Sequence, residues 1–419
     1  MSPQNTPLSR LPKTIVLAFD GTANKFGARN TNVIRLFSML EKEKPDEQVV
    51  YYQPGLGTYL ASEAAWSPTE KAISELMDKA LALYLDVHIM DGYRFLMANY
   101  KQNDRVCMFG FSRGAYTARC LAGMLKKALV QVGLLLPGND QMVASAYEHY
   151  LDLSPRGTDL ASDFKEAFSI ECPIEFLGLW DTVSSVGIRN SKHLPLTASN
   201  SQVKTVRHAL ALDERRAKFR PNRWHLSSRN CDEEARWRRQ EKTPTAESVC
   251  PENSSAIDRA SLRRRHRVAE SSGAAGYNRA TDVIEVWFAG DHSDVGGGRK
   301  AEENRPSNPS LAWMISEIIR SKVPILFKQG EHLKPPTGFE FSSTRKRLTV
   351  PGDTRSNLGE TTMPTHEEMK HLQQRDKSLD AKSQIHDALT KTWLWWTLEC
   401  LPFRHSTSDE DFKGWRRSV

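Results

Sequence analysis

The sequence predicts an α/β fold with a mostly parallel sheet and helices on both of its faces. Short apolar runs rich in β-branched residues alternate with segments of helical periodicity. Strands that are apolar throughout, without polar alternation, are typical of parallel sheets buried on both sides. With 419 residues, 39% of them hydrophobic, the chain can form one large domain with additions.

Five segments are predicted strands: 14–19, 48–55, 104–111, 174–183 and 282–298. Helical patterns fill the intervals, over 30–40, 69–100, 113–127 and 311–320. The last two strands each end in an acid or a histidine. This arrangement predicts that chemically active side chains gather at one edge of the sheet.

Composition divides the chain into five parts. Between Asp213 and Ala280 the pattern becomes polar and arginine-rich, as in DERRAKFRPNR and SLRRRHR, without a clear period. The predicted parts are a disordered tail at 1–12, the first part of the core at 13–212, a basic insertion or lid with partly disordered tracts at 213–280, the second part of the core at 281–330, and a C-terminal loop with a tryptophan-rich helical extension at 331–419.

The stretch GFSRG places Ser112 between Gly110 and Gly114, after an apolar strand and before an alanine-rich helix. A serine on a tight strand-to-helix turn needs small neighbours two residues away on either side, and the turn raises its hydroxyl to the edge of the sheet. The backbone N–H of Arg113 would then face a developing oxyanion. The pattern predicts a nucleophile; the alternative is a serine that caps an ordinary helix.

A serine nucleophile needs a base, and His292 in AGDHSDVGGG is the best candidate because it ends a core strand. Most other histidines are assigned to helical or polar insertion sequence: His208, His225, His266, His366, His371, His386 and His405.

The acid that orients this base is predicted to be Asp181 in GLWDTV, at the end of a strand. The order Ser112, Asp181, His292 is the chain order of α/β-hydrolases. Asp291 and Asp294 are competing candidates, and Asp181 could instead cap the next turn.

A second oxyanion donor is expected in the loop Asp20-Gly21-Thr22, from the amide of Gly21 or Thr22. The alternative is a glycine turn capped by Asp20. The same stretch, AFDGT, is similar to the D-x-D-G-T of phosphatases that form an aspartyl-phosphate. In that reading Ala18 occupies the position of the nucleophile, so the attacking carboxylate is missing.

Seven motifs together resemble the α/β-hydrolase family that contains the catalytic domains of type VI secretion phospholipase effectors. They are FDGTANKFGARNTNVIRL, YYQPGLGT, GFSRGAYTARCLAGML, FLGLWDTVSSVG, HALALDERRAKFRPNRW, WFAGDHSDVGGG and HDALTKTWLWWTLECLP. The resemblance spans nearly the whole chain and implies the triad Ser112, Asp181 and His292. It also implies activity on phospholipids or other acyl esters. The arginine-rich segment after Trp224 departs from the family pattern.

The predicted function is therefore that of a serine esterase or phospholipase without a cofactor or metal. The net charge of +7, the basic insertion and Trp393, Trp395 and Trp396 suggest peripheral contact with anionic membranes. The alternative is a catalytically silent scaffold that binds membranes or nucleic acid through its arginines. Nucleic acid is not expected as a partner, because no nucleic-acid motif is present.

Location and redox state are predicted from the N-terminus and the cysteines. The N-terminus lacks an apolar signal segment and no run of 18 apolar residues occurs, so an intracellular protein is expected. The six cysteines show no C-x-x-C pair and are expected to be reduced. The sequence predicts no oligomeric state.

Overall fold

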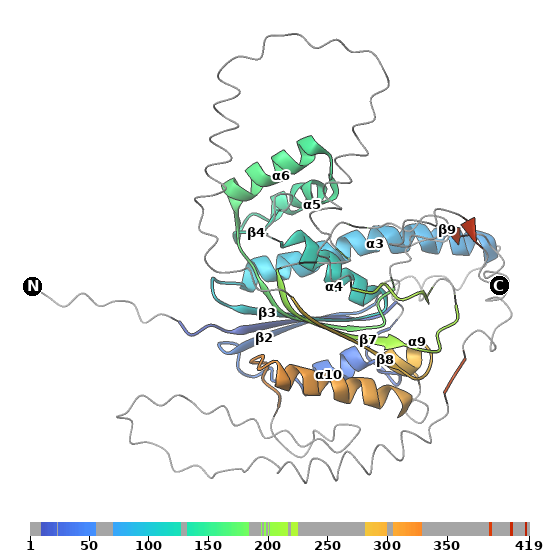
Figure 1. Cartoon of the computed structure of the whole chain (residues 1–419). Coiled ribbons are helices and arrows are strands. Elements are labelled where there is room, and N and C mark those ends of the chain that lie inside the picture. The colour runs from blue at the N-terminus through green and yellow to red at the C-terminus, as the bar shows by residue number, and fades with distance from the viewer. Residues whose placement is uncertain are drawn as a thin grey trace, which may run out of the picture.

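The computed structural model describes residues 10–22, 24–55, 70–126, 132–183, 194, 197, 200, 202–216, 219–224, 281–299, 305–328, 385–387, 403–404 and 415–416, with the backbone alone for 70–83. Within these residues a six-stranded sheet forms the centre of the molecule (Figure 1). All its neighbouring strands run parallel. Their order is β2 (Gln48–Gln53), β1 (Thr14–Phe19), β3 (Arg105–Phe111), β6 (Ile174–Trp180), β7 (Val203–Ala211) and β8 (Asp282–Phe288).

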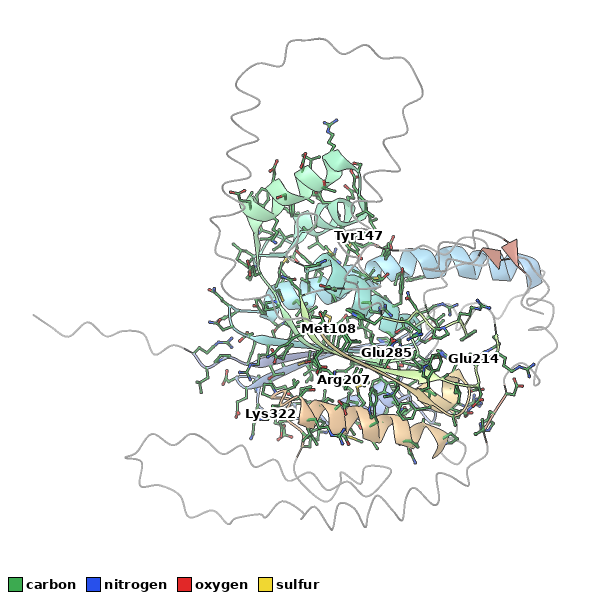
Figure 2. The ribbon with its side chains drawn as sticks, in the orientation of Figure 1. Met108, Tyr147, Arg207, Glu214, Glu285 and Lys322 are labelled. Atoms are coloured by element: carbon green, nitrogen blue, oxygen red, sulfur yellow. The ribbon has the colours of Figure 1, made fainter. Side chains whose placement is uncertain are left out.

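Helices cover both faces of this sheet (Figure 1). One core joins the sheet to α3 (Glu70–Asn99), α4 (Arg113–Met124), α5 (Val143–Leu151) and α6 (Pro155–Phe168). The other core joins the opposite face to α1 (Asn32–Met39), α9 (His292–Gly296) and α10 (Asn308–Arg320). In Figure 2, Met108 lies in the sheet and Tyr147 lies on the α5 side of it.

Smaller elements complete the described part. They are the 3-10 helices η1 (Asp140–Met142) and η4 (Arg305–Ser307), the antiparallel pair of β4 (Leu134–Leu135) with β5 (Ser169–Ile170), and the pair of β9 (Phe403–Arg404) with β10 (Trp415–Arg416). No helix in the described ranges combines the length and the apolar composition needed to cross a bilayer. Cys107, Cys120 and Cys172 are buried free thiols.

The predicted fold class is confirmed, and a strand begins at or next to the start of each of the five predicted strand segments. The prediction of a strand as far as residue 298 is wrong, because β8 ends at Phe288 and the following residues form the helix α9, which starts with a capping box. The long helix predicted after residue 69 is present as α3.

Strand β7 was not predicted, and the assignment of His208 to helical or insertion sequence is wrong. His208 lies on β7 and is fully buried. The error has a physical cause: Arg207 and His208 are polar yet buried, because Arg207 pairs with Glu317 and His208 with Glu285.

The predicted insertion begins too early at Asp213. Residues 213–216 and 219–224 are described and bond to the core, for example through the Asp213 N–H, which donates to the Gly290 carbonyl at 3.0 Å. The remainder, 225–280, lies outside the described residues, as do the tail at 1–9 and Trp393, Trp395 and Trp396.

The turn between β3 and α4 leaves no room for side chains at its two glycines. A Cβ atom on Gly114 would lie 2.3 Å from the Phe19 carbonyl oxygen, and one on Gly110 would lie 2.5 Å from the Ala115 Cα. Both obstacles are backbone atoms of β1 or α4, which cannot move aside cheaply. The two glycines therefore permit α4 to start directly against the sheet.

We predict that Gly114→Ala lowers the free energy of unfolding by about 1–3 kcal/mol, because the new methyl group would clash with the end of β1. Urea unfolding measures this change. Gly27→Ala is the matched control, since the atom nearest to its Cβ lies 4.0 Å away. Equal stabilities of the two variants would contradict the packing argument.

Candidate active site

Ser112 follows β3 in an uncommon backbone conformation, with φ 58° and ψ −124°. A non-glycine residue keeps a positive φ only where surrounding contacts hold it. The Ser112 N–H donates to the Trp180 carbonyl at 3.0 Å, and its carbonyl accepts from the Val183 N–H at 3.3 Å. The side chain does not cap α4, so the alternative of a capping serine does not describe this turn.

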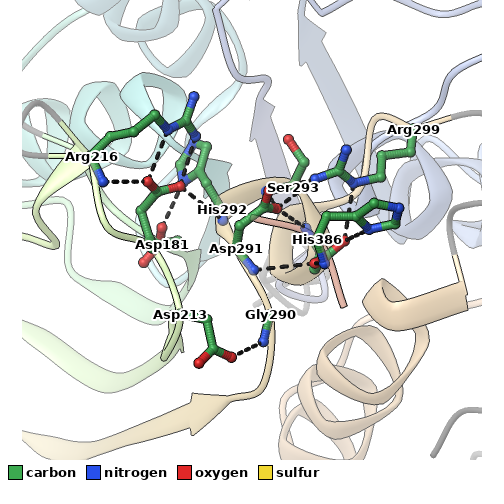
Figure 3. Close-up of polar contacts among 11 residues, drawn as sticks. Asp181, Asp213, Arg216, Gly290, Asp291, His292, Ser293, Arg299 and His386 are labelled. Atoms are coloured by element: carbon green, nitrogen blue, oxygen red, sulfur yellow. Dashed lines mark hydrogen bonds and ion pairs between the residues drawn. The ribbon is translucent and has the colours of Figure 1, made fainter. Parts of the chain in front are cut away.

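Asp181 lies in the sequence between Trp180 and Val183, whose backbone groups are hydrogen-bonded to Ser112. It directly follows β6, also with a positive φ of 37°, and its N–H donates to the Ala209 carbonyl. Its Oδ1 accepts from the Ala211 N–H at 3.1 Å, and its Oδ2 lies 2.6 Å from His292 Nδ1 (Figure 3). Because a carboxylate oxygen accepts, the contact places a proton on Nδ1, and in the neutral imidazole this tautomer leaves the lone pair on Nε2.

The His292 ring is fixed by aromatic contacts as well as by Asp181. It stacks on Phe111, the neighbour of Ser112, with ring centroids 4.6 Å apart, and meets the edge of Phe219 at 4.9 Å. The Arg216 guanidinium lies 3.6 Å above the Phe219 ring. The imidazole is thus held beside the serine turn in an almost completely buried position.

Glu214 supports the same histidine from the loop after β7. Its Oε2 accepts from the His292 N–H at 3.2 Å, and its carboxylate also accepts from Arg216 Nε and Nη2 at 2.8 and 2.7 Å (Figure 3). Burial alone would raise the pKa of Glu214, but the bonds and charge of Arg216 lower it on balance. Sequence reasoning missed Glu214, although it lies in the motif HALALDERRAKFRPNRW.

Asp291 and Asp294, the competing acids, point away from the imidazole and toward Arg299. Arg299 Nη2 lies 2.7 and 2.6 Å from the two Asp291 oxygens, and Arg299 Nε lies 3.0 Å from Asp294 Oδ1. The two carboxylates also form a capping box at the start of α9. Burial would lower the pKa of Arg299, but these bonds raise it. Their role in this structure is to hold α9.

A second buried histidine, His208, contacts the residue that follows Asp181. His208 Nε2 accepts from the Thr182 N–H at 3.1 Å, so its Nδ1 donates to Glu285 Oε1 at 2.9 Å. Burial lowers the pKa of His208, although the bond to Glu285 opposes this. A neutral His208 therefore fixes the residue that follows Asp181.

The loop after β1 is organised by Asp20. The carboxylate accepts from the Gly21 N–H, the Thr31 hydroxyl and the Tyr52 hydroxyl, each at 2.8 Å. This is the capped glycine turn that was the alternative for this loop. Since the Gly21 amide is engaged by Asp20, Thr22 is the better candidate for the second oxyanion donor. Arg113 Nη1 contacts the Thr22 hydroxyl at 3.1 Å.

The described residues contain no group of three or more histidine, cysteine or acidic side chains arranged to hold a metal ion. In the cluster of Asp291, His292 and Asp294, both carboxylates are instead paired with the Arg299 guanidinium, and the Asp294 carboxylate also contacts His386.

The chain matches a known protein family over most of its length. The family described as "T6SS, Phospholipase effector Tle1-like, catalytic domain" matches residues 13–317. The chain belongs to this family. The resemblance inferred from the seven motifs is thereby confirmed.

Individual proteins are also similar to this chain. The "Uncharacterized protein YEL023C" of Saccharomyces cerevisiae is 32% identical over 504 positions, which cover 93% of this chain and 73% of the yeast protein. Two solved structures are also similar. An uncharacterized protein from Pseudomonas aeruginosa has a TM-score of 0.36 and 17% identity over 90% of this chain, which spans about half (51%) of the Pseudomonas chain. The Tle1 effector bound to the VgrG spike has a TM-score of 0.32 and 14% identity, covering 77% of this chain and 75% of the effector.

The pKa of Asp20 makes the stability of this loop depend on pH. Burial raises the pKa from 3.8 to about 6, and the three hydrogen bonds to the carboxylate only partly offset this. A raised folded-state pKa gives stability that is present below the unfolded pKa and lost as the pH rises through the folded pKa. We predict that the stability of the wild type relative to Asp20→Asn falls by roughly 3 kcal/mol as the pH rises from about 4 to about 7.

Urea unfolding of both proteins across this range measures the effect. A relative stability that rises with pH would show that the folded protein favours the ionised carboxylate, contrary to this prediction.

Proposed function

We propose that the chain is a serine hydrolase that cleaves acyl esters, with phospholipids as the substrate class, through Ser112, His292 and Asp181. The observation that carries the proposal is the pairing of His292 Nδ1 with Asp181 Oδ2 at 2.6 Å, beside a serine on a glycine-flanked strand-to-helix turn. Membership of a phospholipase effector family supports the substrate class.

In this mechanism Ser112 Oγ attacks the ester carbonyl carbon while His292 Nε2 takes the hydroxyl proton. Asp181 keeps the proton on Nδ1 and stabilises the imidazolium that forms. The carbonyl π electrons move to oxygen, and the backbone N–H groups of Arg113 and Thr22 donate to this oxyanion.

Collapse of this intermediate expels the alcohol portion of the lipid, which takes the proton back from His292 Nε2. Water then attacks the acyl-enzyme by the same path, with His292 as base, and releases a fatty acid and free Ser112. No metal or cofactor takes part in these steps.

Membrane contact by the basic insertion and by Trp393, Trp395 and Trp396 belongs to the same proposal. Arginines attract anionic headgroups, and tryptophans favour the interface between headgroups and acyl chains. These segments lie outside the described residues, so the proposal for them rests on their sequence.

We predict that a fluorophosphonate probe labels the wild type once, and that Ser112→Ala abolishes both labelling and release of fatty acid from phospholipid vesicles. The fold should remain intact, because this side chain at the sheet edge contributes little to packing. Intact mass and circular dichroism measure these outcomes. Ser316→Ala, which removes a hydroxyl that donates to the Ala312 carbonyl of its own helix, is the matched control and should label normally.

Two results would count against the proposal. Labelling that survives in Ser112→Ala would place the reactive serine elsewhere. Absence of labelling and turnover in folded wild type, together with salt-sensitive vesicle binding that survives Ser112→Ala, would indicate a silent binding scaffold.

We predict that Asp181→Asn lowers kcat by about 10⁴-fold with little change in KM, because an amide stabilises neither the Nδ1–H tautomer nor the imidazolium. Steady-state hydrolysis of a soluble ester measures both constants. A loss of less than tenfold would exclude Asp181 as the orienting acid.

A further inference from the structure

His386 and Asp387, called the tether below, contact the elements on either side of His292. The His386 backbone N–H donates to Asp294 Oδ2 at 2.8 Å, and His386 Nδ1 lies 2.8 Å from Asp294 Oδ1 (Figure 3). Asp387 Oδ2 accepts from Arg215 Nη1 at 2.9 Å. Asp294 belongs to α9, and Arg215 is the neighbour of Glu214, which accepts from the His292 N–H. The tether therefore joins the helix that carries His292 to the loop that supports it.

The Asp294 carboxylate depends on His386 for half of its hydrogen bonds. Within the described part of the chain its four donors are the Asp291 N–H at 3.2 Å, Arg299 Nε at 3.0 Å and the two nitrogens of His386. The Asp294 side chain is 0% exposed, so water does not reach it in this conformation. A buried carboxylate that loses a donor has two outcomes. It remains buried without that hydrogen bond, which destabilises the folded state, or it rotates toward solvent.

A rotation of the Asp294 side chain toward solvent would displace His292, because α9 is short. It spans the five residues from His292 to Gly296, little more than one helical turn, and a helix of this length has no stability of its own. Asp294 is two residues from His292. The position of His292 therefore also depends on what holds Asp294.

We propose that His386 is a positioning residue, and that the tether fixes the first turn of α9 and, through it, the His292 imidazole. The kinetic consequence rests on the proposed hydrolase function. The matched family region ends at residue 317, so this support for the site comes from a part of the chain beyond it.

The first test is kinetic and uses the full chain. His386→Ala should lower kcat by roughly ten- to a hundredfold with KM nearly unchanged, because the base is displaced while the rest of the site is retained. His386→Asn, whose amide can donate to Asp294 Oδ1, should recover most of the loss. Ile385→Ala, at a neighbouring side chain that is 50% exposed, is the matched control and should behave as wild type.

The second test monitors the His292 Nδ1–H proton by NMR and requires no substrate turnover. A low-field proton NMR signal from His292 Nδ1–H, assigned by its loss in His292→Ala, should be sharp in the wild type and in Ile385→Ala. It should be broadened or lost in His386→Ala and return in His386→Asn. This pattern supports the tether even if the wild type hydrolyses no ester, in which case only the proposed function fails.

Other outcomes overturn the proposal. If His386→Ala keeps the signal and a kcat within twofold of wild type, the tether does not position His292. If His386→Asn lowers kcat as much as His386→Ala does while both variants retain the wild-type signal, the effect does not act through the bond to Asp294.

Discussion

The backbone turn at Ser112 is the constraint on which the candidate site depends. Its positive φ is tolerated because both peptide groups of the turn are bonded to the segment that contains Asp181, through the Trp180 carbonyl and the Val183 N–H. Ser112 and Asp181, the proposed nucleophile and acid, are therefore placed by one set of backbone contacts at the ends of β3 and β6. The same turn requires two positions without side chains, since α4 begins against the end of β1.

The histidine side of the site is built on a different principle. Val295 packs α9 into the apolar core, but acidic side chains on both sides of the helix also bond to arginines and to backbone N–H groups. Buried charges of this kind add little net stability, but they disfavour other arrangements because each partner left alone is costly. The sheet thus supplies the stability of the domain, while the charged clusters determine where the base lies.

Much of this arrangement could be predicted from the sequence because the signals were local. Apolar runs fixed the strands, the spacing of Gly110 and Gly114 indicated the turn, and a histidine just after a strand stood out from the others. The supports could not be predicted, because each joins residues that are distant in the chain and individually unremarkable. Glu214 and His386 sit in polar sequence, where a charge normally suggests a solvated surface. Arg207 and His208 concealed β7 because their partners, Glu317 and Glu285, come 77 or more residues later.

The parallel order of the strands also determines when the site can exist during synthesis. Ser112 and Asp181 are in place once β6 has paired with β3, but their partner His292 lies 111 residues after Asp181. The contact between Asp294 and His386 spans a further 92 residues. A growing chain emerges from its N-terminus, so Ser112 is synthesised before His292 by at least the translation time of the whole intervening sequence. The candidate site is consequently incomplete in the nascent chain and is assembled only after the last of these segments has docked.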